Sequence, residues 1–309
     1  MKYLFLFLIF PGFLFSACMG LLAGWVDRKV TARVQWRAGP PWYQNFFDVI
    51  KLLFYKETVI PANISKIIFL GMPLLSLAAA ALISTIILVI NGSPSTGFIG
   101  DLIVVIYLLM IPAISLMLGG FASANPLASL GASREMKLML SYELPFIIAI
   151  LVPVIKSGYA IKLGDIITHQ SVSAHTIGSL SGVLSFIVVL LCVQAKLGFA
   201  PFDMPEAETE IMAGPYIEYS GKALGIFKLA KAVLLFILPV LMITLYFGGI
   251  VLNAEAFVRN VFQFLFILVI LVVIKNTNPR VRIDQAVGFF WGPVTALAII
   301  SVALAHFGY

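Results

Sequence analysis

The side chains of this chain that could do chemistry are mainly carboxylates, and several of them fall in one short run. The run from Ala200 to Ser220 reads APFDMPEAETEIMAGPYIEYS, and its acids are Asp203, Glu206, Glu208, Glu210 and Glu218. Neighbouring carboxyls resist ionising together, so they release protons in separate steps. Apolar, aromatic and proline residues interleave with the acids, which favours partial burial over a solvated acidic loop. The run therefore predicts a site that takes up and releases protons.

Another acid, Glu143, lies inside an apolar run, in the sequence Ser141-Tyr142-Glu143. An ionisable group at membrane depth is costly unless it is paired, hydrated or protonated. Desolvation favours the protonated form, which suits a proton carrier. The alternative is a buried glutamate that is neutralised or held by a partner without moving a proton.

Two lysines at the start of a later apolar run could compensate these acids. Lys228 and Lys231 are three residues apart, so they share a face if the run is helical. A buried lysine titrates readily and can pair with a carboxylate. The alternative is that the ammonium groups reach back to the membrane surface.

Redox cofactors and metals have few possible ligands here. The three histidines are in a predicted loop (His169 and His175) or near the end of the chain (His306), and the two cysteines, Cys18 and Cys192, are far apart. Haem and iron–sulfur ligation need more than this, and no phosphate-binding glycine loop is evident. We expect the chain to bind no cofactor or metal of its own.

The composition indicates which elements must position these residues. Hydrophobic residues make up 61% of the 309 residues and charged residues 11%, and the mean hydropathy is +1.06. A soluble domain is typically about half apolar and about a quarter charged. These values exclude soluble, disordered, collagenous and disulfide-stapled proteins. We therefore attribute the net charge of +6 to basic loops of a membrane protein and not to nucleic-acid binding.

The apolar runs predict an all-α, polytopic membrane protein of about eight transmembrane helices. A span needs about 20 apolar residues, and strand-like alternation is absent. We expect one integral membrane domain, residues 1–309, and read the first run as a retained span rather than a signal peptide. The predicted spans are 3–26, 67–90, 102–121, 138–155, 179–195, 229–252, 256–274 and 286–307.

Basic residues predict the orientation. With the N-terminus outside, sixteen of the twenty lysines and arginines fall in or beside the inner segments, as the positive-inside rule requires. We therefore expect a multi-pass protein of the cell (plasma) membrane with both termini outside, and soluble partners at the inner face. Residues 42–57 place aromatic and aliphatic side chains on one helical face, which predicts an amphipathic helix in the cytoplasmic interface. This helix either anchors the chain or lines the mouth of a site.

Several motifs together resemble one membrane subunit of respiratory complex I, the H subunit. Asp27 to Pro40 (DRKVTARVQWRAGP) resembles the loop after the first span of that family, and Arg134 with Ser141-Tyr142-Glu143 resembles its R…SYE segment. Ala200 to Glu210 with Glu218-Tyr219-Ser220-Gly221 resembles its acidic signature. Pro279-Arg280 with Asp284-Gln285 resembles the segment before its last span.

The chain departs from quinone-using members of that family at two places. Those members commonly have AETNR before APFD, where this chain has Ala195-Lys196-Leu197-Gly198-Phe199. They also place a glutamate where this chain has Lys231. In these respects the chain is similar to the homologous subunit of energy-converting membrane-bound [NiFe]-hydrogenases and related ferredoxin-dependent complexes.

The resemblance implies a non-redox subunit that couples electron transfer in a docked peripheral arm to proton or sodium translocation. It implies a path of buried acids, supporting polar residues around it, and basic residues that contact the peripheral arm. The implied path is Glu143, Glu206, Glu208, Glu210 and Glu218; the supporting residues are Arg134, Tyr142, Asp203, Lys196, Lys228 and Lys231; the docking residues are Arg28, Lys29, Arg33 and Arg37.

The implied partners are hydrogenase-like large and small subunits on the cytoplasmic face, antiporter-like membrane subunits and the lipid bilayer. Iron–sulfur clusters, and a NiFe centre in the hydrogenase case, would be bound by the partner subunits. Three alternatives stay open at this point: a quinone-site subunit of NADH-quinone oxidoreductase, a stand-alone ion transporter and a passive scaffold.

Overall fold

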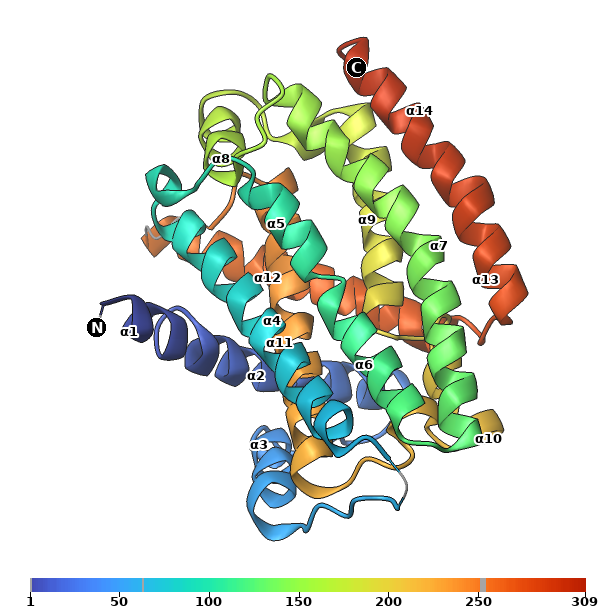
Figure 1. The fold of residues 1–309 in the computed structure, drawn as a ribbon. Helices are drawn as coiled ribbons and strands as arrows, with labels where there is room; N and C mark the ends of the chain where they lie inside the picture. The colour runs from blue at the N-terminus through green and yellow to red at the C-terminus, as the bar shows by residue number, and fades with distance from the viewer. Residues whose placement is uncertain (1, 63, 251–253) are drawn as a thin grey trace.

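A computed structural model describes residues 2–62, 64–250 and 254–309, and within these residues the fold is built of helices without a β-strand. The helices are labelled in Figure 1. Their bounds are α1 (Lys2–Leu8), α2 (Phe13–Val34), α3 (Gln44–Ile50), α4 (Lys66–Gly92), α5 (Asp101–Leu108), α6 (Ile111–Ala122), α7 (Pro126–Lys156), α8 (Leu163–Val172), α9 (Leu180–Lys196), α10 (Glu208–Ile211), α11 (Gly221–Tyr246), α12 (Ala254–Thr277), α13 (Ile283–Phe289) and α14 (Thr295–His306).

Each predicted span coincides with helical structure, which confirms the all-α polytopic membrane fold; the end of the sixth span, 251–252, lies outside the described residues. Seven of the described helical segments are long and apolar enough to cross a membrane, and α9 is a shorter apolar helix of 17 residues. The predicted bounds were least accurate where polar residues continue a helix beyond its apolar run. α7 begins twelve residues before the predicted residue 138, because Pro126 occupies its first turn and the Asn125 side chain caps the Leu127 N–H.

Three features differ from the sequence prediction. The first predicted span, 3–26, is interrupted over residues 9–12, which include Pro11, so it forms α1 and the start of α2. The third span is broken into α5 and α6 next to Pro112, which lacks the N–H needed to continue the hydrogen-bond ladder. The segment 156–178 is not simply a solvated loop, since it contains α8, in which Leu163 and Ile166 are fully buried. The carboxylate of Asp101 accepts a hydrogen bond from the Leu163 N–H at 2.7 Å, which fixes the start of α8.

Helix α11 lies at the centre of the molecule and is buried along most of its length. It packs against α2 and α4 on one side, while α7, α9 and α14 pack against one another on the other side. In Figure 1, α2 and α12 run obliquely across the remaining long helices. A hydrophobic cluster that includes Ala17 and Ala298 joins these helices.

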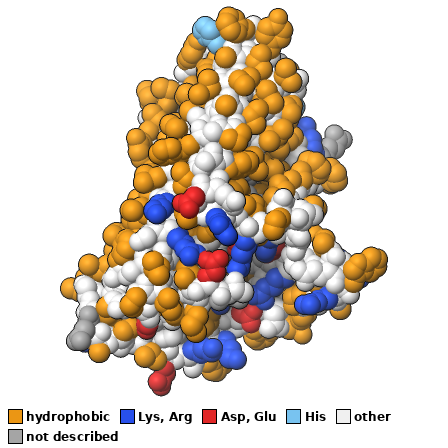
Figure 2. Space-filling view, turned by 90° about the vertical axis from the view of Figure 1, so that its right-hand side faces the viewer, with side chains coloured by type: hydrophobic (Ala, Val, Ile, Leu, Met, Phe, Trp, Pro, Cys, Tyr) orange, Lys and Arg blue, Asp and Glu red, His pale blue; other side chains and the backbone are white. Residues whose placement is uncertain are grey.

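Charged side chains are concentrated towards one end of the molecule. Figure 2 shows lysine, arginine, aspartate and glutamate side chains over the lower part of one face and mostly apolar side chains above them. The segments between α2 and α4 and between α9 and α11 lie at this lower end in Figure 1, which we call the charged end. Its assignment to the inner side of the membrane stays a prediction.

The predicted amphipathic helix is present. Helix α3 continues as a π-helical turn over Lys51–Tyr55. Asn45, Val49 and Leu52 are buried, whereas Phe47 and Phe54 are exposed on the opposite face. This division matches a helix whose outer face lies in a membrane interface.

Helix α7 can approach the acidic run closely because residue 131 is glycine. A Cβ atom at Gly131 would lie 2.6 Å from Pro215 Cδ and 2.8 Å from Gly214 Cα, so any larger residue must push the two segments apart. We expect Gly131→Ala to lower the free energy of unfolding by about 1–3 kcal/mol through overpacking. Gly71→Ala in α4 is the matched control, because nothing lies within 4 Å of its Cβ position. Thermal unfolding in detergent would measure both; equal stability of the two variants would contradict this packing.

Candidate functional site: a cluster of acids and lysines

The deepest charged contact described in the protein joins α7 to α9. Lys196 Nζ, at the end of α9, lies 2.6 Å from Glu143 Oε2, and the two side chains are only 4% and 9% exposed. The ammonium also lies 4.8 Å and 4.5 Å from the ring centroids of Tyr142 and Phe146. Because both charges are removed from water, each needs the other. Glu143 is therefore buried with an ion-pair partner, and its other oxygen, Oε1, is buried without a hydrogen-bond partner in the described structure.

A second ion pair lies nearer to the charged end. Lys231 Nζ from α11 lies 2.6 Å from Glu206 Oε1, and these side chains are about one-third exposed. Glu206 lies in the 3-10 turn Met204–Glu206, within the acidic run. Two of the predicted lysines, Lys196 and Lys231, therefore meet two of the predicted acids, one pair deep between helices and one at the edge.

A third carboxyl, Glu135, was not identified from the sequence. Its residue is 9% exposed, and among the described residues it has no ion-pair partner. Glu135 precedes Tyr142 by seven residues in α7, so the two share a helical face. That spacing was the available signal, but the predicted span began at residue 138 and so excluded Glu135.

Most of these groups line one cavity. It has a volume of about 50 Å³, and its polar lining is Ser76, Glu135, Tyr142, Lys196, Glu206, Tyr216 and Lys231. Glu143 lies directly behind this lining, in contact with Lys196. A water molecule needs roughly 10–15 Å³ of such volume and several polar partners, so the cavity has room for more than one. With both ion pairs formed, one of the three carboxyls is in excess, and it can be neutralised by a proton.

The remaining predicted acids lie outside this cavity lining. Glu210 is exposed and pairs with Arg134 at 2.6 Å. Glu218 Oε1 accepts a hydrogen bond from Asn125 at 2.6 Å. Asp203 pairs with Arg280 at 2.6 Å. The side chain of Glu208 lies outside the part of the chain that the structure describes. The structure thus brings Glu143 and Glu206 into one cluster and places Glu210 and Glu218 at separate contacts.

The predicted docking residues form part of the charged end. Arg28 pairs with Asp48 at 2.9 Å, and Lys29 donates a hydrogen bond to the Ala38 carbonyl. Arg33 and Arg37 are exposed. Arg28, Lys29 and Arg33 lie within α2, which continues beyond its apolar part to Val34, and residues 25–34 contain no glycine or proline that would interrupt it.

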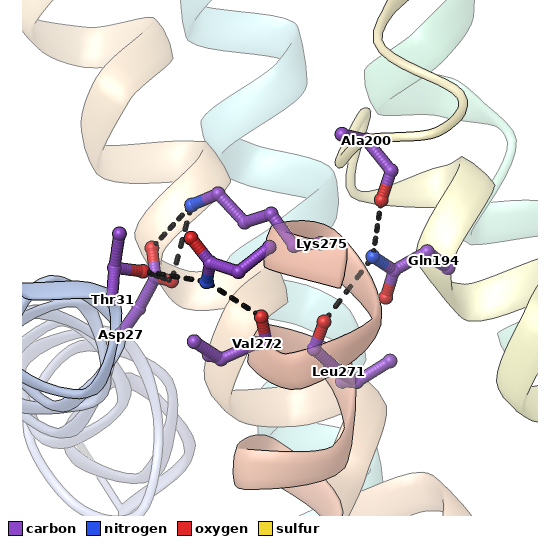
Figure 3. A network of polar contacts seen from close by, with 8 residues as sticks. Asp27, Thr31, Gln194, Ala200, Leu271, Val272 and Lys275 are labelled. Atoms are coloured by element: carbon purple, nitrogen blue, oxygen red, sulfur yellow. Dashed lines mark hydrogen bonds and ion pairs between the residues drawn. The ribbon is translucent and has the colours of Figure 1, made fainter. Parts of the chain in front are cut away.

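A polar network ties α2 to α12 next to the acidic run (Figure 3). Lys275 Nζ lies 2.9 Å from Asp27 Oδ2, and Lys275 also lies 4.3 Å from the ring centroid of Phe199. Gln194 donates to the carbonyls of Ala200 and Leu271. These contacts fix the segment that follows α9 and therefore help to position the start of the acidic run.

The fold and the site define a class: polytopic helical membrane proteins with a charged cluster buried between their helices. Comparison with known proteins is more specific. The sequence model of the family described as NADH dehydrogenase matches residues 6–306, and the chain belongs to this family. It is 34% identical to the H subunit of NADH-quinone oxidoreductase from Thermomicrobium roseum, over 94% of this chain and 92% of that protein.

Two further relatives agree with this assignment. The H subunit of NADH-quinone oxidoreductase from Carboxydothermus hydrogenoformans is 30% identical over 96% of this chain and 86% of that protein. A chain of the membrane-bound sulfane sulfur reductase, an archaeal respiratory membrane complex, has a TM-score of 0.89 at 27% identity and covers 99% of this chain and 100% of its own. The resemblance inferred from the motifs is confirmed: the chain is an H-type membrane subunit of a respiratory complex.

The buried pair predicts a strong coupling between its two members. Lys196→Met leaves the Glu143 carboxylate buried without a counter-charge, which should cost about 3–5 kcal/mol of stability. Lys196→Met combined with Glu143→Leu should recover most of that loss, because no charge is then left unpaired. Unfolding of the single and double variants in detergent measures the coupling. Additive losses in the double variant would show that the pair does not interact as described.

The contact between Arg134 in α7 and Glu210 predicts that the acidic run is held against α7 in a pH-dependent way. The hydrogen bond and the charge of Arg134 lower the pKa of the Glu210 carboxyl below its ordinary value. Because this pKa is lower in the folded state, the contact stabilises the fold at pH values above the ordinary carboxyl pKa. The stabilisation is lost as the pH falls through the lowered pKa. Hydrogen exchange of residues 204–211 should be faster in Glu210→Gln than in the parent at neutral pH, and the difference should disappear in acid. A difference that persists in acid would contradict this assignment.

Proposed function

We propose that this chain is the non-redox coupling subunit of a ferredoxin-oxidising respiratory complex that reduces protons or sulfur compounds. In this proposal a peripheral arm with the iron–sulfur clusters, and a NiFe centre in the hydrogenase case, docks at the charged end. Antiporter-like membrane subunits then move protons or sodium ions. The chain lies in the plasma membrane with both termini outside.

One observation carries the proposal: three carboxyls and two lysines gather at a small cavity that has room for water. Such a cluster is sensitive to an added charge nearby, because electrostatic interactions are strong where water is largely excluded. An electron arriving in a docked arm would favour uptake of a proton by the carboxyl in excess. Loss of that proton, or a change of partner by Lys196 or Lys231, would then alter the field that acts on adjacent ion-translocating subunits.

The exposed residues of the charged end support docking of a peripheral arm there. Trp36 is 97% exposed and lies between the exposed residues Arg33 and Arg37. Tryptophan and arginine are enriched at protein interfaces. In this proposal Arg28, Lys29, Arg33 and Arg37 contact the peripheral subunits. Glu206 and Glu143 are the inner members of the path of acids. Glu208, Glu210 and Glu218 form its outer part, and Arg134, Asp203 and Lys228 support it.

A second candidate is the quinone-site subunit of an NADH-quinone oxidoreductase. It is favoured by the identities of 34% and 30% to proteins of that name. Lys196, Phe199 and Lys231 favour the ferredoxin-dependent proposal, because they replace residues that quinone-using members commonly have. Turnover of the purified complex with a quinone, but not with protons or a sulfur compound as acceptor, would establish the second candidate instead.

The proposal predicts that electron transfer is uncoupled from ion translocation when a carboxyl of the cluster is replaced by an amide. Glu143→Gln and Glu135→Gln should each abolish most ion translocation by the complex in liposomes, while the electron-transfer activity of the detergent-solubilised complex is largely retained. Glu57→Gln is the control, because Glu57 is exposed and lies outside the cluster.

Three outcomes would contradict the proposal. Unchanged translocation in an assembled Glu143→Gln complex would indicate a scaffold. Ion transport by this chain alone in liposomes would indicate a stand-alone transporter. Equal loss in Glu57→Gln would show that the effect is not specific to the cluster.

A further inference from the structure

A cavity opens at the end of the molecule opposite the charged end, where α8 and the end of α14 lie in Figure 1. Its volume is about 380 Å³, and its walls come from the ends of α7 and α14, the last residues of α8 and the segment 173–179 that leads into α9. A volume of about 300–1,000 Å³ is typical of sites that bind small molecules. We call this space the distal cavity.

The lining of the distal cavity is hydrophilic, and among the described residues it contains no acidic, aromatic or large aliphatic side chain other than histidine. Besides alanine, glycine and proline, the lining residues are Lys156, Ser157, His169, Gln170, Ser173, His175, Thr176 and Ser179. A hydrocarbon chain would gain little by binding here, because burial of apolar area needs apolar walls. The lining therefore favours a small, water-soluble ligand with many hydrogen-bonding groups.

Three basic side chains of this lining have no charged partner. Lys156, His169 and His175 take part in none of the ion pairs of the described residues. The acid of α8, Asp165, lies outside the lining and pairs with Lys162 at 3.8 Å. The ammonium offers three N–H donors and each imidazole at least one. Such donors around one space without a carboxylate favour an anion with several acceptor oxygens.

The start of α9 adds to the positive potential of the distal cavity. Ser179 caps this helix by accepting from the Gly182 N–H at 3.1 Å, and it also lines the cavity. The N–H groups in the first turn of a helix attract anions. At the ends of α7 and α14 a free carbonyl would repel an anion, but the Pro153 and Ala305 carbonyls already accept backbone N–H groups.

One buried acceptor identifies a further feature of the ligand. Gln170 lines the distal cavity and is 3% exposed. Its Nε2 donates to the Leu245 carbonyl at 2.9 Å, which ties α8 to α11 and leaves Oε1 on the other side of the amide. This Oε1 is buried without a donor in the described structure. An unsatisfied buried acceptor is costly, so a ligand with a hydroxyl that donates to it is favoured.

We propose that the distal cavity binds a small, water-soluble phosphate that carries a hydroxyl, either inorganic phosphate or the phosphate monoester of a polyol. The phosphate oxygens accept from Lys156, His169 and His175, and the hydroxyl donates to Gln170 Oε1. Inorganic phosphate keeps a proton at neutral pH and a polyol ester has hydroxyls of its own, whereas sulfate has no donor. A site that hydrogen-bonds a ligand hydroxyl rejects analogues that lack it.

The bound phosphate would join helices that are otherwise held together mainly by apolar contacts at this end. Lys156 belongs to α7 and His169 to α8, while His175 lies in the segment that leads into α9. In the predicted orientation the distal cavity faces the outside of the membrane, so the ligand would enter from there. The site is remote from the acid cluster and does not depend on the proposed function.

Equilibrium dialysis of the purified intact complex against radiolabelled inorganic phosphate tests this proposal, with unlabelled glycerol 3-phosphate and sulfate as competitors. Lys156→Gln should weaken phosphate binding about tenfold or more, because a hydrogen bond between charged groups contributes at least that factor. Sulfate should compete at least about tenfold less well than phosphate in the parent. Gln170→Leu should remove this preference, whereas Lys156→Gln should weaken both anions alike.

The controls separate a built site from general attraction to basic residues. Lys162→Gln is the matched control, because it removes a lysine just before α8 that does not line the distal cavity, and it should leave phosphate binding unchanged. His169→Gln, at an exposed position, should give a partial loss and replaces Lys156→Gln if that complex fails to assemble. Tighter binding of glycerol 3-phosphate would identify a polyol ester as the ligand, and tighter binding of phosphate the free ion.

Each contrary result overturns the proposal. Phosphate binding that is absent in the parent, or that falls equally in Lys162→Gln, would show that the distal cavity holds no phosphate site. Sulfate that binds as tightly as phosphate would show that Gln170 recognises no hydroxyl. Displacement of phosphate by phosphatidic acid but not by glycerol 3-phosphate would indicate a lipid site.

A metal ion is the remaining contrary occupant. Zn²⁺ binding that requires both His169 and His175 and survives Lys156→Gln, in a complex that does not bind phosphate, would indicate a metal site instead. None of these results bears on ion translocation by Glu143→Gln, so the proposed function is tested separately.

Discussion

The structure depends on the contact between Lys196 and Glu143. Two opposite charges lie 2.6 Å apart and almost completely out of water, at the meeting of α7 and α9. Neither charge could be kept there alone, because an unpaired buried ion costs several kcal/mol. Once this pair is fixed, the C-terminal end of α9 and the segment after it are held against α7. The acidic run that follows is thereby brought over the cavity in which Glu135 and Glu206 meet the lysines.

The cluster contains one more carboxyl than lysines, and this excess allows it to take up a proton. A cluster with equal numbers of acids and bases can settle into fixed ion pairs, whereas three carboxyls that share two ammonium groups have more than one way to distribute charge. The outer pair, Lys231 with Glu206, is less buried than the inner pair, and Lys231 also lines a larger cavity at the charged end.

Hydropathy was sufficient to predict the eight helical spans and the amphipathic helix, since each depends on the local sequence of apolar residues. It could not give the break beside Pro112 or the folding of α8, which depend on contacts such as the one between Asp101 and the Leu163 N–H. The position of Glu143 within an apolar run identified it as a buried acid. The lysine spacing identified Lys231, which pairs with Glu206, whereas Lys228 is exposed and has no ion-pair partner among the described residues. The pairing itself could not be predicted, because Glu143 and Lys196 are 53 residues apart. Glu135 was missed because the predicted span began at residue 138, whereas α7 begins at Pro126 and encloses it. The single-domain organisation and the orientation stay predictions.

The central claim is that a carboxyl of this cluster gains or loses a proton when the docked arm changes its redox state. Infrared difference spectroscopy of the intact complex, reduced against oxidised, measures this directly, because a protonated carboxyl has a carbonyl stretch that a carboxylate lacks. We expect a carboxyl signal that disappears in Glu135→Gln and persists in Glu57→Gln. A parent spectrum without any carboxyl signal, or one that is unchanged in Glu135→Gln and Glu143→Gln, would contradict the claim.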